Sequence, residues 1–286
     1  MKIEKLPKSK FPKPLLEIPQ PPKQLFILGN LPDQDLIHLC IVGSRKFTTY
    51  GKEACEKIID GLRGYPIVIV SGFAMGIDTI AHKKAMEVGL KTLVFPGSGL
   101  ADAAMYPKTN IKLIREVLDH GGCLVSEFPP DLKAEYWTFP MRNRLMAGIS
   151  KAVLVIEAEE KSGTMITARL ATEYNRDLLA VPGAIFNQNS KGTNKLIKLG
   201  ATPVTCAEDV LEALGFKIDN ESKQATLFDD ASPMEKKVLE LLREPLPRDE
   251  LLRAMKVKTA EANAILSVME IKGYIKEELG EIRTAF

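Results

Sequence analysis

The sequence predicts an α/β protein with a doubly wound, mainly parallel sheet, followed by a small winged helix-turn-helix domain. Short apolar runs rich in β-branched residues alternate with helix-length amphipathic segments across residues 25–215. Such alternation is typical of right-handed βαβ crossovers, which build a parallel sheet with helices on both faces. From residue 233 the pattern changes to three helical segments and two short strands, the order of elements in a winged helix.

The elements follow one another along the chain in a regular order. In the main domain we expect strands at residues 25–28, 39–42, 67–70, 92–95, 123–125, 152–156 and 178–181. We expect helices at residues 51–62, 76–88, 108–120 and 164–175. In the C-terminal domain we expect helices at 234–242, 248–255 and 259–272, and strands at 274–278 and 281–283.

Composition divides the chain into four parts. Residues 1–24 contain six lysines and six prolines, which predicts a basic, extended N-terminal arm. Residues 25–215 form the main domain. Residues 216–232 are polar and acidic with few apolar side chains, as in a linker, and residues 233–286 form the winged-helix domain.

The overall composition excludes several classes of protein. The formal net charge is only +2, so any nucleic-acid contact must come from local clusters of cations. No apolar run approaches the roughly 20 residues that span a bilayer, and the N-terminus lacks a signal sequence, so we expect a cytoplasmic protein without membrane contact. The four cysteines are far apart and show no C-x-x-C pair, which predicts reduced thiols and no metal site.

The most informative stretch is residues 139–176. A basic segment, Arg142-Asn143-Arg144, leads through a turn of small residues into the apolar strand 152–156. After the strand comes Ser162-Gly163-Thr164, which opens a helical pattern. Small residues at a helix start leave backbone N–H groups free to bind an anion, and guanidinium groups bind phosphate bidentately. The stretch therefore predicts a phosphate site at the carboxyl edge of the sheet, where open α/β folds bind ligands.

Two further loops at strand ends carry the same kinds of residue, one after strand 39–42 and one after strand 67–70. Each loop alone is weak evidence for a ligand site, because Gly and Ser are common in tight turns and at helix N-caps. Together they should converge on one edge. The expected contacts with the anion are Gly43, Ser44, Arg45, Lys46, Ser71, Gly72, Arg142, Asn143, Arg144, Ser162, Gly163 and Thr164.

The sequence contains neither a complete dinucleotide-binding fingerprint nor a P-loop. In the segment that begins at Gly97, Asp102 stands where a dinucleotide fingerprint needs its third glycine, and no G-x-x-x-x-G-K-[ST] loop occurs, so we expect no cofactor. Asp78 and His82 at i and i+4 could form an acid–base pair or a structural contact, and we favour the structural reading.

Two carboxylates and an aromatic stretch leave alternatives open. Glu127 and Glu157 could be catalytic, or could bind backbone N–H groups or an arginine. The aromatic stretch 136–139 could stack on bases, although core packing is the more common role of aromatic residues in such folds. With no nucleophile in evidence, we predict no catalytic residue.

The winged-helix domain has no basic surface in its sequence. Residues 233–286 contain ten Lys plus Arg and ten Asp plus Glu, and the third helix carries Glu261 and Glu270. The two glutamates would repel DNA phosphates, so we favour contact with a protein over recognition of duplex DNA for this domain. Deletion of the domain should then spare DNA binding.

At this point the motifs resemble those of the DNA-processing protein A family, also called DprA or Smf. The resemblance extends from about residue 11 to residue 215. The matching motifs are Ile41-Val42-Gly43-Ser44-Arg45, Tyr50-Gly51, Val70-Ser71-Gly72, Gly76-Ile77-Asp78, Ala81-His82, Gly97-Ser98-Gly99, Tyr106-Pro107, Ser126-Glu127, Phe139-Pro140, Arg142-Asn143-Arg144, Ser162-Gly163-Thr164, Pro182-Gly183 and Gly200-Ala201.

The resemblance implies an extended Rossmann domain without enzymatic activity that binds single-stranded DNA and loads a RecA-type recombinase, in natural transformation or repair. It also implies a homodimer built through that domain. Many relatives begin with a helical domain, for which the short arm here leaves no room. Alanine at Arg142 and Arg144 should then weaken DNA binding and leave the fold intact. The alternative is a nucleotide-processing enzyme similar to phosphoribohydrolases, with Glu127 as its catalytic carboxylate.

Overall fold

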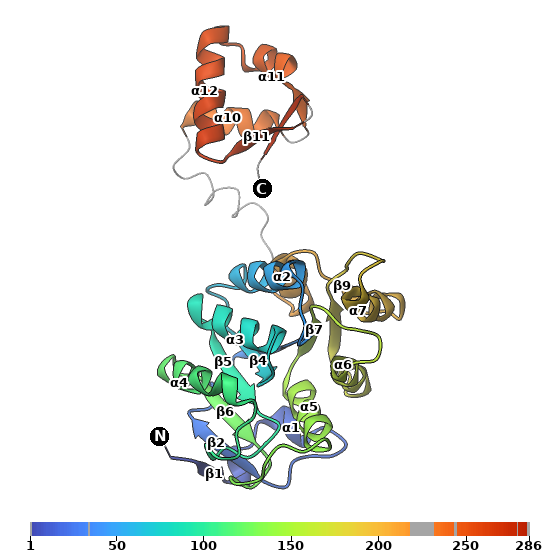
Figure 1. Ribbon diagram of the computed structural model, residues 1–286. Coiled ribbons are helices and arrows are strands. Elements are labelled where there is room, and N and C mark those ends of the chain that lie inside the picture. The colour runs from blue at the N-terminus through green and yellow to red at the C-terminus, as the bar shows by residue number, and fades with distance from the viewer. Residues whose placement is uncertain (1, 34, 218–231, 243–244, 279, 285–286) are drawn as a thin grey trace. The chain divides into compact units, whose positions relative to one another are not determined.

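The computed structural model describes residues 2–33, 35–217, 232–242, 245–278 and 280–284. The chain divides into two compact units, residues 1–218 and 219–286 (Figure 1). The first is an α/β unit and the second a winged helix, which confirms the predicted fold class. Most of the predicted linker, residues 218–231, lies outside the described residues.

The α/β unit is built on a nine-stranded sheet with the order β1-β2-β6-β5-β4-β3-β7-β8-β9. The seven strands from β6 to β9 in this order are parallel, whereas β1 and β2 pair antiparallel at one edge. The strands are β1 (Glu4–Leu6), β2 (Leu25–Gly29), β3 (Ile37–Val42), β4 (Ile67–Gly72), β5 (Lys91–Phe95), β6 (Cys123–Ser126), β7 (Ala152–Val155), β8 (Asp177–Ala180) and β9 (Thr202–Pro203).

Helices cover both faces of the sheet (Figure 1). One face is covered by α1 (Lys13–Leu16), α5 (Thr138–Ile149), α6 (Gly163–Glu173) and α7 (Gln188–Lys198). The other face is covered by α2 (Thr49–Asp60), α3 (Ile77–Glu87), α4 (Ile111–Asp119) and α8 (Ala207–Ala213). Short 3-10 turns, η1 (Lys8–Lys10) and η2 (Lys108–Asn110), precede α1 and α4. Alternate side chains of each central strand enter the two apolar clusters, as strand geometry requires.

The chain changes direction across the sheet between β3 and β7. From β3 it passes outward through β4, β5 and β6, and then returns to β7 on the other side of β3. The helix after β3, α2, packs on one face, whereas the helix after β7, α6, packs on the opposite face. The connections therefore separate at the carboxyl ends of these two strands, which is where open α/β sheets form a ligand crevice.

The prediction that residues 1–24 form an extended arm is wrong. Residues 4–6 add β1 to the edge of the sheet, and α1 lies against α5. Phe11, Leu15 and Ile18 are buried in the same core cluster as the central strands. Burial of these apolar side chains outweighs the tendency of a lysine- and proline-rich segment to remain extended.

A second difference concerns residues 138–149, which form α5 where the sequence suggested a basic segment and a turn. Pro140 lies in the first turn, where a missing N–H costs nothing. Leu145, Met146 and Ile149 then turn toward the core at helical spacing.

The winged-helix unit has three helices and a three-stranded sheet in the order β10-β12-β11. The elements are α10 (Pro233–Leu241), β10 (Leu246–Pro247), α11 (Arg248–Met255), α12 (Thr259–Ile271), β11 (Ile275–Glu278) and β12 (Glu281–Thr284). Leu251, Leu266 and Ile282 are fully buried in its core. Only the two-residue strand β10 was not expected.

Three of the four cysteines are buried and all four are free thiols. Burial raises the pKa of Cys123 to about 12, so its thiol stays protonated. Across the described ranges, no group of three or more His, Cys, Asp or Glu side chains is arranged to hold a metal ion. None of the described helices combines the length and apolar character needed to cross a membrane.

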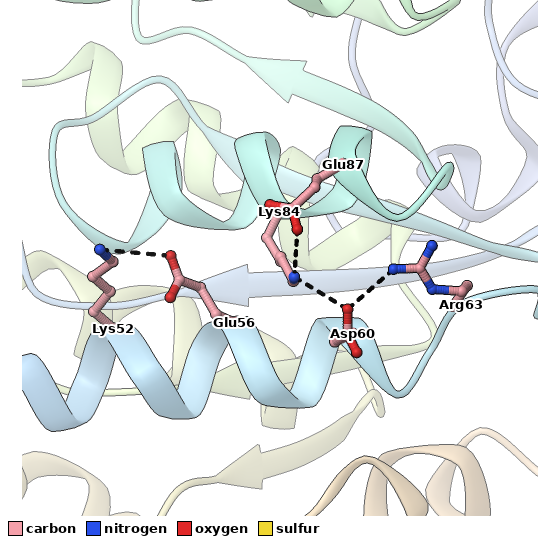
Figure 2. Close-up of polar contacts among 6 residues, drawn as sticks. All are labelled: Lys52, Glu56, Asp60, Arg63, Lys84 and Glu87. Atoms are coloured by element: carbon pink, nitrogen blue, oxygen red, sulfur yellow. Dashed lines mark hydrogen bonds and ion pairs between the residues drawn. The ribbon is translucent and has the colours of Figure 1, made fainter. Parts of the chain in front are cut away.

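An ion-pair network joins α2 to α3 on the surface (Figure 2). The Lys84 ammonium lies 3.1 Å from the Asp60 carboxylate and 2.8 Å from that of Glu87, and Arg63 also reaches Asp60. The Lys84 side chain is only 15% exposed, so its methylene groups pack between the helices. These contacts lower the pKa of Asp60.

Lys84→Ala should lower the free energy of unfolding by about 1 kcal/mol, from loss of packing and of two partly screened ion pairs. Urea unfolding followed by the fluorescence of Trp137, the only tryptophan, measures this in the α/β unit. Lys52→Ala is the control, because its pair with Glu56 lies within α2 at 3.9 Å and is exposed. Equal effects of the two substitutions would show that Lys84 does not tie the helices together.

Candidate functional site

A cavity of about 430 Å³ lies at the carboxyl ends of β3 and β7. Its walls are the loop after β3, the middle of α5 and the start of α6. The predicted segments 43–46, 142–143 and 162–164 all line it. The structure thus brings nine of the twelve predicted residues together in one place.

The loop after β3 is held in shape by contacts with its neighbours. The Ile77 N–H donates to the Ser44 carbonyl at 3.2 Å, and the Thr164 hydroxyl donates to the Gly43 carbonyl at 3.1 Å. Gly76 has a φ of +88°, and a Cβ there would lie 2.4 Å from the Ser44 carbonyl oxygen. Only glycine permits this close approach.

Two arginines face the cavity in different ways. The Arg45 guanidinium lies 5.6 Å from the centre of the Phe139 ring, a cation–π distance, and retains donors for an anion. Arg142 is buried and donates to the Phe95 carbonyl and, at 3.0 Å, to the Asn143 amide oxygen. Arg142 therefore supplies fixed positive charge in the wall of the cavity.

The start of α6 forms the opposite wall. Ser162 occupies the N-cap position, and its buried hydroxyl has no hydrogen-bond partner among the described residues. A Cβ at Gly163 would meet open space, so no side chain or backbone crowds this side of the helix start. Free N–H groups and the helix dipole favour an anion at such a position.

Asp78 lies in the floor of the cavity, in contact with Gly72 and beside Arg142. Burial raises the pKa of this carboxyl, and the neighbouring Arg142 charge opposes the shift. Arg45, Lys46 and Arg142 face only Asp78 and Glu159 as lining carboxylates. The cavity therefore carries a positive excess and suits a phosphate group.

Three predicted contacts do not line the cavity. The Ser71 hydroxyl donates to the Ile41 carbonyl at 2.6 Å, and Gly72 lies below the floor, where a Cβ would overlap Arg142 and Asp78. Arg144 lies elsewhere. Its guanidinium pairs with Glu127 and donates to the Gln20 carbonyl at 2.6 Å.

We expected that replacing Arg142 and Arg144 by alanine would leave the fold intact. For Arg144 this expectation is corrected, because its side chain is part of a structural ion pair. The Arg144 side chain is buried and that of Glu127 is only 11% exposed, so removing one leaves the other charge without its partner. A helix turns by about 100° per residue, so side chains two apart point in nearly opposite directions. This is why Arg142 reaches the cavity and Arg144 does not.

Neither candidate catalytic glutamate lines the cavity. Glu157 is buried and accepts hydrogen bonds from the Thr48 N–H at 2.9 Å and the Thr48 hydroxyl at 2.5 Å, which fixes the start of α2. Glu127 is paired with Arg144. Each carboxylate has the structural role that the sequence left open.

The Asp78–His82 pair also does not form. His82 is fully buried, and its Nε2–H donates to the Gly72 carbonyl at 2.8 Å, while Nδ1 faces the Thr92 hydroxyl. Burial lowers the pKa of His82 to about 4, so the ring is neutral at pH 7. The imidazole joins α3 to β4 and β5.

The aromatic stretch 136–139, at the start of α5, departs from the expected core packing. Tyr136 is 95% exposed and Trp137 is 54% exposed, whereas Phe139 lines the cavity beneath Arg45. Sequence reasoning missed Met146 and Thr167, which also line the cavity. They lie one helical turn beyond Arg142 and Gly163, so helical periodicity was the signal that could have found them.

The sequence profile of the DNA recombination-mediator protein A family matches residues 3–215, and that of the DprA winged helix domain matches residues 222–281. Protein Smf of Escherichia coli is 40% identical over 206 residues, which cover 72% of this chain and 54% of that protein. DNA processing protein DprA of Streptococcus pneumoniae is also 40% identical over 206 residues, covering 72% of each chain.

Two solved structures are similar. One is DNA processing protein A from Streptococcus pneumoniae, with a TM-score of 0.68 and 37% identity over 76% of this chain and 75% of that chain. The other, from Helicobacter pylori, was solved to describe its single-stranded DNA binding mode. Its TM-score is 0.66, with 31% identity over 74% of this chain and 95% of that chain.

His82 should make the α/β unit less stable in mild acid. Its pKa is about 4 in the folded chain and about 6.5 when unfolded, so the unfolded state binds more protons between these values. Stability is therefore lost as pH falls, by about 2 kcal/mol between pH 7 and pH 5. Urea unfolding at both pH values should show a smaller loss in His82→Gln than in the parent chain. The same loss in both would contradict the buried neutral ring.

Arg144→Ala should lower the free energy of unfolding by about 3 kcal/mol, because the largely buried Glu127 carboxylate is left unpaired. The double variant Arg144→Ala/Glu127→Ala should recover part of this loss, as a double-mutant cycle measures. Arg169→Ala is the control, since its pair with Glu173 is exposed on α6. A fully additive cycle would contradict the buried pair.

Proposed function

This chain belongs to the DNA recombination-mediator protein A family, and we propose that its α/β unit binds single-stranded DNA through the cavity between β3 and β7. One observation carries the proposal. Three cationic side chains and the open N-terminus of α6 converge on one cavity, built from loops that are far apart in the sequence. Phosphate is the group that such a combination binds best.

A single strand fits this site better than a duplex. One phosphate backbone can enter a cavity of this size, and the unpaired bases are then free to lie against neighbouring apolar side chains. Phe139 lies in the cavity, and Tyr136 and Trp137 are exposed just before α5. The single-stranded DNA binding of the Helicobacter pylori relative supports this choice.

Within the site, Arg45 and Lys46 contact phosphates directly. Both lie in the loop after β3 and line the cavity. Backbone N–H groups at residues 162–164 and the Ser162 hydroxyl supply neutral donors. Arg142 contributes a positive electrostatic potential from the wall of the cavity and helps to fix the shape of that wall. Arg144, Ser71 and Gly72 act by positioning these groups and not by contact.

The bound strand is protected and delivered to a RecA-type recombinase, in transformation or repair. The family's description as a recombination mediator supports this step. A non-enzymatic role also agrees with the structural engagement of Glu127 and Glu157. The test is whether the chain speeds recombinase loading onto DNA already covered by a single-strand-binding protein, and no acceleration would refute this step.

The winged helix is proposed to contact protein and not duplex DNA. Its third helix, α12, contains two glutamates and neither Lys nor Arg between Thr259 and Ile271. A helix that enters the major groove normally carries cations toward the phosphates. The exposed Val268 and Ile271 on this helix instead suit an apolar partner.

Fluorescence anisotropy with a labelled oligonucleotide of about 35 nucleotides, single-stranded and then duplexed, tests the proposal across a salt series. We expect a strong preference for the single strand, with log affinity falling by about 0.7 per phosphate contact for each decade of salt. Arg45→Ala and Lys46→Ala should each weaken binding and reduce the salt slope by about one contact. Arg63→Ala is the control, because Arg63 pairs with Asp60 away from the cavity.

Three results would contradict the assignment. Equal affinity for both DNA forms would point to the winged helix, and absence of binding to either would remove DNA as the ligand. Unchanged salt slopes in Arg45→Ala and Lys46→Ala would move the phosphate site away from the cavity.

A further inference from the structure

The loop between β8 and α7 carries two strongly exposed apolar side chains. Phe186 is 91% exposed and Ile185 is 74% exposed. A phenylalanine ring in water contributes no burial energy to the fold. Two adjacent apolar side chains that are both exposed on one loop form a candidate contact surface for another molecule.

Hydrogen bonds tie this loop and the first turn of α7 to the segments that follow β3 and β7. The Tyr50 hydroxyl donates to the Pro182 carbonyl at 2.6 Å, and the Asn189 amide donates to the Lys46 carbonyl at 2.5 Å. The Ala158 N–H donates to the Asn189 carbonyl at 2.7 Å, next to the lining residue Glu159. Phe186 thus belongs to a loop that is attached on both sides to the segments after β3 and β7.

The loop is also braced internally. The Asn194 side chain accepts from the Gly183 N–H at 3.2 Å and donates to the Gly183 carbonyl at 2.9 Å. Asn187 caps α7 through the Asn189 N–H at 2.9 Å. These bonds hold the backbone around Phe186, so the ring is presented outward by an ordered loop. An aromatic side chain presented in this way loses little entropy on binding.

We propose that Phe186 is a stacking platform for a base of the DNA strand whose phosphates occupy the cavity. The proposal rests on the proposed function and extends the strand's path from Lys46 toward α7. Phosphates held by Arg45 and Lys46 leave the attached bases at the rim, where every base offers a face for stacking regardless of sequence. Phe47, 41% exposed and adjacent to Lys46, offers a second aromatic face next to the phosphate-binding loop.

Phosphate contacts and base contacts can be separated by using two probes of equal length. One is oligo-dT, and the other is an abasic oligonucleotide that keeps the phosphates and lacks the bases. Phe186→Ala should bind oligo-dT about tenfold more weakly than the parent chain, the size expected for one stacked base. Its affinity for the abasic strand should be unchanged. Leu16→Ala, which removes an exposed apolar side chain from α1, should change neither affinity.

A tryptophan at the same position should restore binding and report the contact. Trp137 is the only tryptophan, so Phe186→Trp in a Trp137→Phe background places a single indole in the loop. Oligo-dT should quench its fluorescence, and the abasic strand should quench it much less. Affinity for oligo-dT should equal that of the Trp137→Phe single variant, which keeps Phe186.

The inference is overturned if Phe186→Ala weakens the binding of oligo-dT and of the abasic strand equally, or if it weakens the binding of neither. It is also overturned if Phe186→Ala changes the sedimentation of the protein without DNA, since the loop would then be an interface between copies of the chain. Failure of the parent chain to bind oligo-dT would refute the proposed function itself. Binding by the parent chain with no effect of Phe186→Ala would refute only this inference.

Discussion

The pairing of β3 with β7 is the constraint on which the site depends. Four residues of each strand lie side by side, from Leu39 opposite Ala152 to Val42 opposite Val155. Because α2 and α6 then pack on opposite faces, the two connections must separate just beyond the strands. The loop 43–48 and the start of α6 face each other across that gap, and α5 closes its third side. The cavity is thus a consequence of strand order, and its charge is a consequence of the residues at the loop positions.

Buried polar groups keep the cavity in one shape. Arg142, Asp78 and His82 are all buried below or beside it, and each has a backbone partner in a neighbouring strand or loop. Gly72 leaves room for Arg142 and Asp78, and Gly76 allows the Ser44 carbonyl to approach. Fixed donors and charges bind an anion without reorganisation, which is how preorganisation contributes to affinity. The two exposed cations, Arg45 and Lys46, are therefore presented from a rigid base.

Sequence reasoning located the central strands well, because continuous apolar runs bounded by Gly, Ser and charged residues have few other interpretations. For the same reason it predicted the loops that line the cavity. It could not distinguish Arg142 from Arg144, since that difference depends on α5 being a helix, and Asn143 and Gly148 weaken the helical signal. The N-terminal segment was misread because its lysines and prolines outnumber Phe11, Leu15 and Ile18, whose partners are distant in sequence. The roles of Glu127 and Glu157 also depend on contacts more than 15 residues away along the chain.

The most direct test of the central claim is a crystal structure of the chain with oligo-dT of about six nucleotides, within the span of one small single-strand site. The account predicts a phosphate in the cavity, within hydrogen-bond distance of Arg45 and of the backbone N–H groups at the start of α6. A strand bound to the winged helix, or one that crosses the α/β unit without a phosphate in this cavity, would contradict it.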